Sequence, residues 1–332
     1  MIVVMGATGA TGSALLERLT ALGVPARALS RDPGRLRARL DRASPARPEP
    51  RTGAPAGPGA GAIAEAGAGT PAGAPVEVRA ADAADPASLR AAFAGASQVF
   101  LTMANGPAQV ALELNAVTAA VESGVRHLVK LSAPGAGPDS PVAVARGHHT
   151  VEEALRTSGI PHTVLRPYAF MQKLLLLAPG VAAHGTVHGA MADAGCNYID
   201  CRDIADVAAA VLTRPELAGH TYTLTGDRTY SHPQLVRLLG DLLGHRVRYA
   251  ELSGPELHRH LTATARMPGW LASHVVEIQR MATTHPESPD GTVPRLLGRP
   301  PRTLETFLRE HLDLFRPGHV TGHVTGYGPG PA

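Results

Sequence analysis

The chain has 332 residues and a formal net charge of +3 at pH 7. Its arginines alternate with acidic residues and form no basic block, so the composition gives no indication of nucleic-acid binding. Two cysteines, Cys196 and Cys201, are too few for a disulfide framework. The sequence shows no signal peptide, and no apolar stretch approaches the roughly 18 residues of a membrane span. We therefore expect a cytoplasmic protein without a nucleic-acid or membrane partner.

The first organised feature is a glycine-rich turn between an apolar run and an amphipathic run. Residues 2–5 are Ile-Val-Val-Met, residues 6–12 are Gly-Ala-Thr-Gly-Ala-Thr-Gly, and a helical pattern covers residues 13–22. Strand, glycine turn and helix in this order are typical of a dinucleotide site, where glycines let the backbone approach a pyrophosphate. The helix N-terminus adds unpaired N–H groups and the positive end of its dipole. The stretch predicts a bound dinucleotide; a plain strand–helix turn is the alternative.

A second short strand is expected over residues 25–30, and Arg31 follows it. An acidic residue at this strand end binds the ribose 2′-hydroxyl of NAD, whereas an arginine suits the 2′-phosphate of NADP. Arg31 therefore predicts NADP(H) as the preferred cofactor and NAD(H) as the second choice; a solvated surface charge is the alternative. Asp32 is better explained as the N-cap of a helix whose first turn contains Pro33.

Two segments differ in composition from the rest of the chain. Residues 43–75 are nearly all Ala, Gly and Pro, without periodicity or large apolar side chains. Such a segment cannot bury enough surface to offset the entropy lost on ordering it. We predict a disordered insertion at 43–75 and a disordered tail at 316–332.

Further strands alternate with helices up to residue 170. Short strands separated by helices predict an α/β protein with a Rossmann-type doubly wound parallel sheet. We assign residues 1–170 to this NAD(P)-binding domain. Residues 171–315 would form a smaller C-terminal α+β lobe, interleaved with the sheet domain, that holds the substrate. The expected strands are residues 76–79, 98–102, 127–131 and 162–166.

Several motifs occur in a characteristic order along the chain. They are Gly6-Ala-Thr-Gly-Ala-Thr-Gly12, Ser30-Arg-Asp-Pro33, Val129-Lys-Leu-Ser-Ala133, Ser158-Gly-Ile-Pro-His-Thr-Val-Leu-Arg-Pro167, Tyr198-Ile-Asp-Cys-Arg-Asp-Ile-Ala-Asp-Val207 and Leu304-Glu-Thr-Phe307. In this order they resemble the NmrA-like proteins, an NAD(P)H-binding group of atypical short-chain dehydrogenases/reductases with quinone- and dye-reducing members. The resemblance covers residues 1–315, and the insertion at 43–75 departs from the family pattern, in which this link is short.

The resemblance implies positions for the parts of the cofactor. Asp82 would lie near the adenine, Arg31 would meet the 2′-phosphate, and Pro167 would border the nicotinamide. The pyrophosphate would lie along Gly6, Thr8, Gly9, Ala10, Thr11 and Gly12, and the ribose along Thr102, Met103 and Ala104.

The helix that carries the catalytic pair in the wider family is altered in this chain. Dehydrogenases of that family use a Tyr-x-x-x-Lys pair, in which the lysine lowers the tyrosine pKa for proton exchange with an alcohol. When the helix is aligned at Glu152, Val144 stands at the tyrosine position and His148 at the lysine position. Ser132 lies near the position of the family's third catalytic residue. Ordinary alcohol oxidation is therefore not expected.

Reduction of an electrophilic acceptor is consistent with this alteration. A quinone, enone or dye accepts hydride readily, so positioning of the nicotinamide against it supplies most of the catalysis. We expect His148 to contact the nicotinamide ribose or donate a proton, with Ser132 beside it; a helix-surface histidine is the alternative. Tyr168, Phe170 and Met171 would form an apolar pocket wall for the small-molecule substrate, with core packing as the alternative.

A second class of function is compatible with the same residues. NmrA-like proteins include sensors that bind NADP without turning it over and act through a regulatory protein partner. A homodimer is also compatible with the sequence. We expect no metal site, because His-Glu-x-x-His is absent and the adjacent His148 and His149 point in different directions on a helix. Asp200, Asp203 and Asp206 suit helix capping and the helix dipole better than acid–base chemistry.

Overall fold

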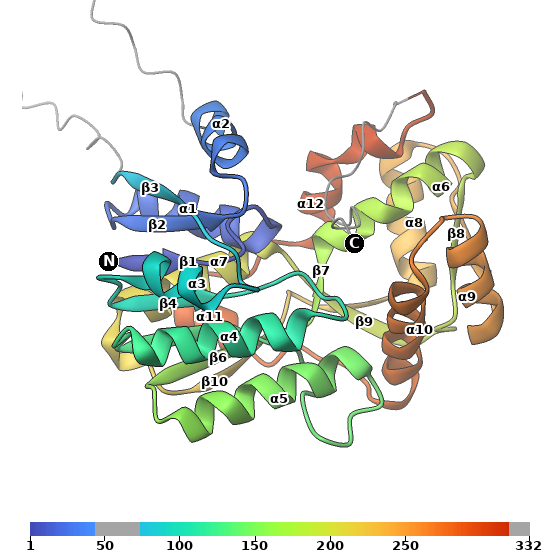
Figure 1. Ribbon diagram of the computed structural model, residues 1–332. Coiled ribbons are helices and arrows are strands. Elements are labelled where there is room, and N and C mark those ends of the chain that lie inside the picture. The colour runs from blue at the N-terminus through green and yellow to red at the C-terminus, as the bar shows by residue number, and fades with distance from the viewer. Residues whose placement is uncertain (44–73, 319–332) are drawn as a thin grey trace, which may run out of the picture.

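The computed structural model describes residues 1–43 and 74–318 (Figure 1). The predicted insertion at 43–75 and the predicted tail at 316–332 lie almost entirely outside the described residues. At the centre is a seven-stranded parallel sheet in the order β10-β6-β5-β4-β1-β2-β3, which confirms the predicted Rossmann-type fold. Its strands are β1 (Ile2–Val4), β2 (Ala26–Ser30), β3 (Val76–Ala80), β4 (Gln98–Leu101), β5 (His127–Leu131), β6 (His162–Pro167) and β10 (Thr221–Leu224).

Helices cover both faces of this sheet because its strands are apolar on both. Ile2 and Val4 pack into one core, whereas Val3 and Met5 pack into the other. The first core includes residues of α1 (Ala10–Ala21), α2 (Pro33–Ala43), α7 (Cys201–Thr213) and α11 (Thr292–Leu297). The second includes residues of α3 (Pro86–Phe93), α4 (Gln109–Glu122) and α5 (Ala143–Ser158), of which α4 and α5 lie in front in Figure 1.

The strand order reverses between β1 and β4. Ligands of doubly wound sheets bind beyond the carboxyl ends of the strands at such a reversal. In this chain the glycine turn follows β1 and residues 102–105 follow β4, so the two predicted cofactor segments meet at that point.

A smaller lobe with its own core is built beside the sheet (Figure 1). Its two short sheets have the orders β11-β9-β7 and β12-β8, with β7 (Ala169–Phe170), β8 (Thr186–Gly189), β9 (Gly195–Ile199), β11 (Thr229–Ser231) and β12 (Arg248–Glu251). Its helices are η1 (Met171–Leu177), α6 (Ala178–His184), α8 (His232–Leu243), α9 (Gly254–Ala263), α10 (Gly269–Thr284), α12 (Leu304–Glu310) and η3 (Leu312–Phe315). Between these elements the chain returns to the sheet domain through α7, η2 (Pro215–Leu217) and β10. Among the described residues, no helix is both long and apolar enough to span a bilayer.

Two glycines allow the close packing of the turn after β1. Gly6 has a φ of +68°, and a Cβ added there would lie 2.6 Å from the carbonyl oxygen of Thr102. Gly12 lies in the first turn of α1, where a Cβ would be 2.2 Å from the carbonyl oxygen of Gly6. Backbone therefore packs directly on backbone at both positions, and neither has room for a side chain.

We predict that Gly12→Ala destabilises the protein by about 1–3 kcal/mol, because the added methyl group must push the helix away from the turn. Chemical denaturation monitored by circular dichroism measures this change. The matched control is Gly269→Ala, at the first residue of α10, where a Cβ would meet no atom within 4 Å. Equal stability of the two variants would contradict the packing argument.

His232, the first residue of α8, is a buried histidine in the core of the lobe. Its ring lies 5.1 Å from the ring of Tyr249, and a Cβ added at Gly189 would lie 2.7 Å from its Nδ1. Burial lowers the pKa of His232 to about 4, although Glu251 opposes the shift. The folded protein therefore holds this imidazole neutral at pH values where the unfolded chain already binds a proton.

This pKa predicts a stability loss in acid. The contribution of His232 is complete above the unfolded pKa near 6.5 and is lost as the pH falls toward about 4. Between pH 7 and pH 4 the wild type should lose up to about 3 kcal/mol more unfolding free energy than His232→Phe, which keeps an aromatic ring without a titrating group. Denaturation curves at several pH values measure the difference. The control, His245→Phe at an exposed position, should follow the wild type; parallel curves for all three proteins would refute the assignment.

Candidate active site

The N-terminus of α1 is built to receive an anion. Its N-cap residue, Gly9, has no side chain, and its first turn contains no acidic residue. Thr8, Gly9 and Ala10 are exposed, so the first backbone N–H groups of the helix face solvent without a cap. Together with the positive end of the helix dipole, these groups suit a pyrophosphate.

Thr11 has a different part in this turn. Its side chain is buried, and its hydroxyl hydrogen-bonds the thiol of Cys201 at the start of α7. Only the backbone N–H of Thr11 can therefore face a phosphate. Burial raises the pKa of the Cys201 thiol to about 12, so this cysteine is an inert part of the contact between α7 and the turn.

Two arginines lie at the carboxyl end of β2 and on the helix that follows. Within residues 1–43 and 74–318, exposed Arg31 makes no hydrogen bond or ion pair, so its guanidinium remains available to a phosphate. Arg39 on α2 reaches back over the glycine turn, where it donates to the carbonyl of Thr8 at 2.5 Å and to the Ser13 hydroxyl at 3.1 Å. The sequence analysis did not identify Arg39. Asp32 caps α2 as predicted, because its carboxylate accepts from the N–H of Arg35 at 2.9 Å.

The segments after β3 and β4 are both held by hydrogen bonds or close packing. The carboxylate of Asp82 accepts from the N–H of Ala84 at 3.0 Å, which fixes the loop expected near the adenine. Thr102 packs on Gly6, and the N–H of Met103 donates to the carboxylate of Glu113 on α4. The segment expected along the ribose is therefore fixed between the glycine turn and a buried carboxylate.

A buried polar cluster connects β5, α4 and α5. Lys130 on β5 and Glu113 on α4 are both 0% exposed, and the Lys130 Nζ lies 2.8 Å from Glu113 Oε1. The same ammonium donates to the carbonyl of Leu131 and lies 3.2 Å from Nδ1 of His148. The amide nitrogen of Gln109 lies 3.3 Å from Nε2 of His148 and 3.5 Å from Glu113 Oε2. His148 is therefore not the helix-surface histidine of the alternative interpretation; only 5% of it is exposed.

Burial determines the charge of these groups. It lowers the pKa of Lys130 and raises that of Glu113, while their mutual attraction opposes both shifts. Burial also lowers the pKa of His148 well below its usual value, with the charges of Lys130 and His274 adding to the effect. His148 is thus a neutral imidazole at neutral pH. With Nδ1 accepting from Lys130, its proton is assigned to Nε2.

Ser132 lies on the same side of the sheet as Lys130, since alternate residues after a strand face the same way. Its hydroxyl donates to Glu152 Oε1 at 2.5 Å, and Glu152 also accepts from Nε of Arg166 at 3.1 Å. Glu152 is one helical turn beyond His148 on α5. Ser132, just after β5, therefore faces the same part of α5 as His148, and its hydroxyl is directed at Glu152.

The predicted pocket residues fall into two groups. Tyr168 and Phe170 are partly exposed, whereas Met171 is fully buried in the core of the lobe. Met171 therefore packs the core, as the alternative interpretation expected, and only Tyr168 and Phe170 can present surface to a substrate. Burial raises the pKa of the Tyr168 phenol, so it stays protonated at neutral pH. Pro167 ends β6 and is buried beside β10.

Helix α10 brings residues to this region that the sequence analysis missed. Glu277 accepts from the N–H of Ala143 at the start of α5 at 2.9 Å, and Met281 Sδ lies 3.7 Å from the Cβ position of Gly135. His274 is close enough to His148 to influence its pKa, and its Nδ1 has no hydrogen-bond partner in the described part of the chain. His274, Glu277 and Met281 repeat with helical spacing, which is the sequence signal for one shared face.

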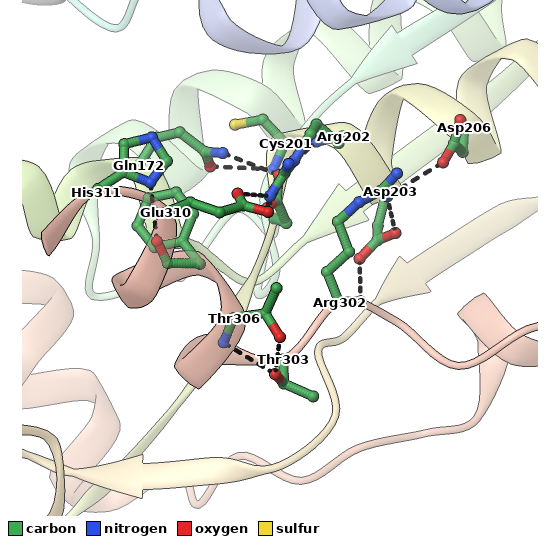
Figure 2. Close-up of polar contacts among 12 residues, drawn as sticks. Gln172, Cys201, Arg202, Asp203, Asp206, Arg302, Thr303, Thr306, Glu310 and His311 are labelled. Atoms are coloured by element: carbon green, nitrogen blue, oxygen red, sulfur yellow. Dashed lines mark hydrogen bonds and ion pairs between the residues drawn. The ribbon is translucent and has the colours of Figure 1, made fainter. Parts of the chain in front are cut away.

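A hydrogen-bond network around the start of α7 joins the lobe to the sheet domain (Figure 2). Gln172 donates to the carboxylate of Asp200 at 2.9 Å and accepts from the N–H of Cys201 at 3.0 Å. Asp200 also caps α7 by accepting from the N–H of Arg202 at 2.8 Å, as predicted. Figure 2 shows Arg302 against Asp203, which is 0% exposed and accepts from the N–H of Arg302 at 2.7 Å.

Two hollows of the surface lie away from these residues. One of about 810 Å³ is lined by α8 and β12, and one of about 350 Å³ lies beside β10. Neither is lined by any predicted site residue. The site is therefore defined by its backbone donors and polar side chains.

Comparison with known proteins agrees with this geometry. An NAD(P)H azoreductase from Xenophilus azovorans is 30% identical over 318 residues, which cover 95% of this chain and 99% of the relative. A (4-alkanoyl-5-oxo-2,5-dihydrofuran-3-yl)methyl phosphate reductase from Streptomyces griseus is 33% identical over 318 residues, 96% of this chain and 100% of the relative. The crystal structure of an NADPH-dependent quinone oxidoreductase from Escherichia coli complexed with NADPH has a TM-score of 0.76 at 25% identity, covering 94% of this chain and 99% of that one.

The fold, the glycine turn and these full-length relatives agree with a family model. The NmrA-like family matches residues 1–308, nearly the whole chain. The chain belongs to the NmrA-like family.

Proposed function

We propose that this chain reduces a small conjugated electrophile, such as a quinone, an enone or a dye, with NADPH. The predicted class and cofactor are confirmed: the chain is an NAD(P)H-dependent oxidoreductase of the NmrA-like family. The observation that carries the choice of acceptor is the residue pair on α5. Val144 has no ionisable group, and His148 is buried and neutral, so this helix offers no phenol–ammonium pair for alcohol chemistry.

The residues of this chain suit the cofactor at each contact. Uncapped N–H groups at the start of α1 would bind the pyrophosphate, Arg31 would meet the 2′-phosphate, and Arg39 would hold the glycine turn. Thr102 and Met103 would line the ribose, and Pro167 would border the nicotinamide. Bound NADPH supplies the hydride. The chain's own contribution is then to orient the acceptor and to provide a proton where the product needs one.

The acceptor is proposed from the chemistry that the relatives' names share. Those names give an azo compound, an unsaturated oxo-dihydrofuran and a quinone. Each has a conjugated π-system that accepts hydride without a strong acid. Tyr168 and Phe170 offer aromatic faces at the carboxyl end of β6, which suit a planar molecule of this kind.

We predict NADPH-dependent turnover of at least one acceptor class in a panel of quinones, enones, azo dyes and cationic dyes. The measurement is loss of the reduced-nicotinamide absorbance with purified protein. A saturated ketone and a primary alcohol with NADP⁺ serve as controls and should give no turnover. Tight NADPH binding with no turnover across the panel would contradict the proposed reductase function and favour the NADP-binding sensor.

We predict that Arg31→Ala weakens NADPH binding by about 10- to 100-fold, because a charge-assisted contact to the 2′-phosphate is worth roughly 1.5–3 kcal/mol. NADH binding should change little, since it lacks that phosphate. Fluorescence titration of both cofactors measures the two affinities. Arg126→Ala, at another exposed arginine, is the control. An unchanged preference for NADPH over NADH in Arg31→Ala would rule out the assignment.

A further inference from the structure

The buried cluster contains a pair of nitrogen atoms arranged for proton transfer. Lys130 Nζ and His148 Nδ1 are 3.2 Å apart, within direct hydrogen-bond reach. The Gln109 amide nitrogen is 3.3 Å from His148 Nε2 and 3.5 Å from Nδ1. A group in line with the Nε2–H bond would lie much nearer Nε2 than Nδ1, so Gln109 does not occupy that direction. The imidazole thus contacts Lys130 through one nitrogen and keeps the other N–H direction free of Gln109.

A purely structural role does not explain this cluster well. Burying an ammonium and a carboxylate carries a desolvation cost that their attraction often fails to recover, and apolar residues of similar size are frequently as stable. Lys130 is 0% exposed and Glu113 is 0% exposed, yet the chain retains both beside His148. His148, beside these two charges, aligns with the position of the wider family's catalytic lysine.

We propose that Lys130 and His148 form a proton relay in which His148 protonates the reduced acceptor and Lys130 replaces the proton. The inference rests on the proposed reductase function. His148 is the residue that would touch the acceptor. Lys130 acts only through His148, which it orients and supplies.

The relay balances in atoms and charge. Hydride addition to a neutral enone forms a C–H bond and leaves an enolate. The enolate takes the proton from His148 Nε2 as the proton of Lys130 Nζ passes to Nδ1. His148 ends neutral with its proton on Nδ1, and Lys130 ends as a neutral amine. A solvent proton binds Nε2 as the Nδ1 proton returns to Lys130, so the imidazole stays neutral. One hydride and one solvent proton are consumed for each turnover.

The surrounding charges support this sequence of states. Burial lowers the pKa of His148, so an imidazolium is avoided throughout, as the relay requires. Burial also lowers the pKa of Lys130, which makes its ammonium a better acid than an exposed lysine. The charged or titratable groups that influence the pair are Glu113 on α4, Glu152 on α5 and His274 on α10. Glu113 and Glu152 oppose the effect of burial on the Lys130 pKa, and the ion pair with Glu113 favours the ammonium form.

Two acceptors distinguish the relay from a structural role. A neutral enone needs a hydride and a proton, whereas a cationic triphenylmethane dye needs only a hydride to become its neutral product. The variants are His148→Phe and the double variant Lys130→Met/Glu113→Gln, which removes both buried charges together. We expect the ratio of enone to dye turnover to fall about 100-fold or more in each, the usual contribution of a positioned acid. His149→Phe, the adjacent histidine on the same helix, should leave the ratio unchanged.

The outcomes separate three conclusions. Selective loss of enone reduction supports the relay. Equal loss on both acceptors, or no loss on either, overturns it while leaving the reductase function in place. Failure of the wild type on both acceptors and on the rest of the panel removes the proposed function and the relay with it.

Nitrogen NMR of the cofactor-free protein gives a readout independent of turnover. Long-range ¹H–¹⁵N spectra, with His148 identified by its absence in His148→Phe, report which ring nitrogen carries the proton. We expect the His148 ring to carry its single proton on Nε2. It should stay neutral even well below pH 6.5, the ordinary histidine pKa. In Lys130→Met/Glu113→Gln, Nδ1 should lose its acceptor contact and the tautomer balance should shift. A His148 that titrates near pH 6.5 in the wild type, or carries its proton on Nδ1, would overturn the relay.

Discussion

The buried ion pair between Lys130 and Glu113 is the constraint on which the site depends. Each charge would be costly alone in this environment, so the two must remain together and fully hydrogen-bonded. Their remaining contacts are to the amide of Gln109, the N–H of Met103, the carbonyl of Leu131 and Nδ1 of His148. One pair thereby connects the segment after β4, the end of β5 and helix α5 in a single arrangement.

A second set of contacts connects both the lobe and the glycine turn after β1 to α7. The helix packs against α1 in the sheet domain, and its first residue, Cys201, hydrogen-bonds Thr11 under the glycine turn. From the other side, Gln172 and Arg302 bind Asp200 and Asp203 at the same helix end (Figure 2). Gln172 in η1 and Arg302 before α12 therefore hold both segments of the lobe against α7, the helix that supports the glycine turn.

The chemistry that we propose differs from that of an alcohol dehydrogenase for an electrostatic reason. A lysine exposed near the cofactor would lower the pKa of a tyrosine and bind the ribose directly. In this chain the ammonium lies on the strand, inside the protein, beside a neutral imidazole. Such an arrangement can deliver a proton to a product anion but cannot generate a phenolate, which matches an acceptor that is already electrophilic.

The sequence by itself determined the features that depend on neighbouring residues. The alternation of strands and helices predicted the parallel sheet, the glycine spacing marked the tight turn after β1, and Asp32 and Asp200 were identified as caps. The order of strands and helices, turn glycines and helix caps can be recognised in the sequence because each depends on residues close together in the chain. Only the tertiary structure decided the partners of Lys130, the reach of Arg39, the place of His274 and the burial of Met171. The spacing of these residues does not identify their partners, because the fold brings each partner from a distant segment of the chain.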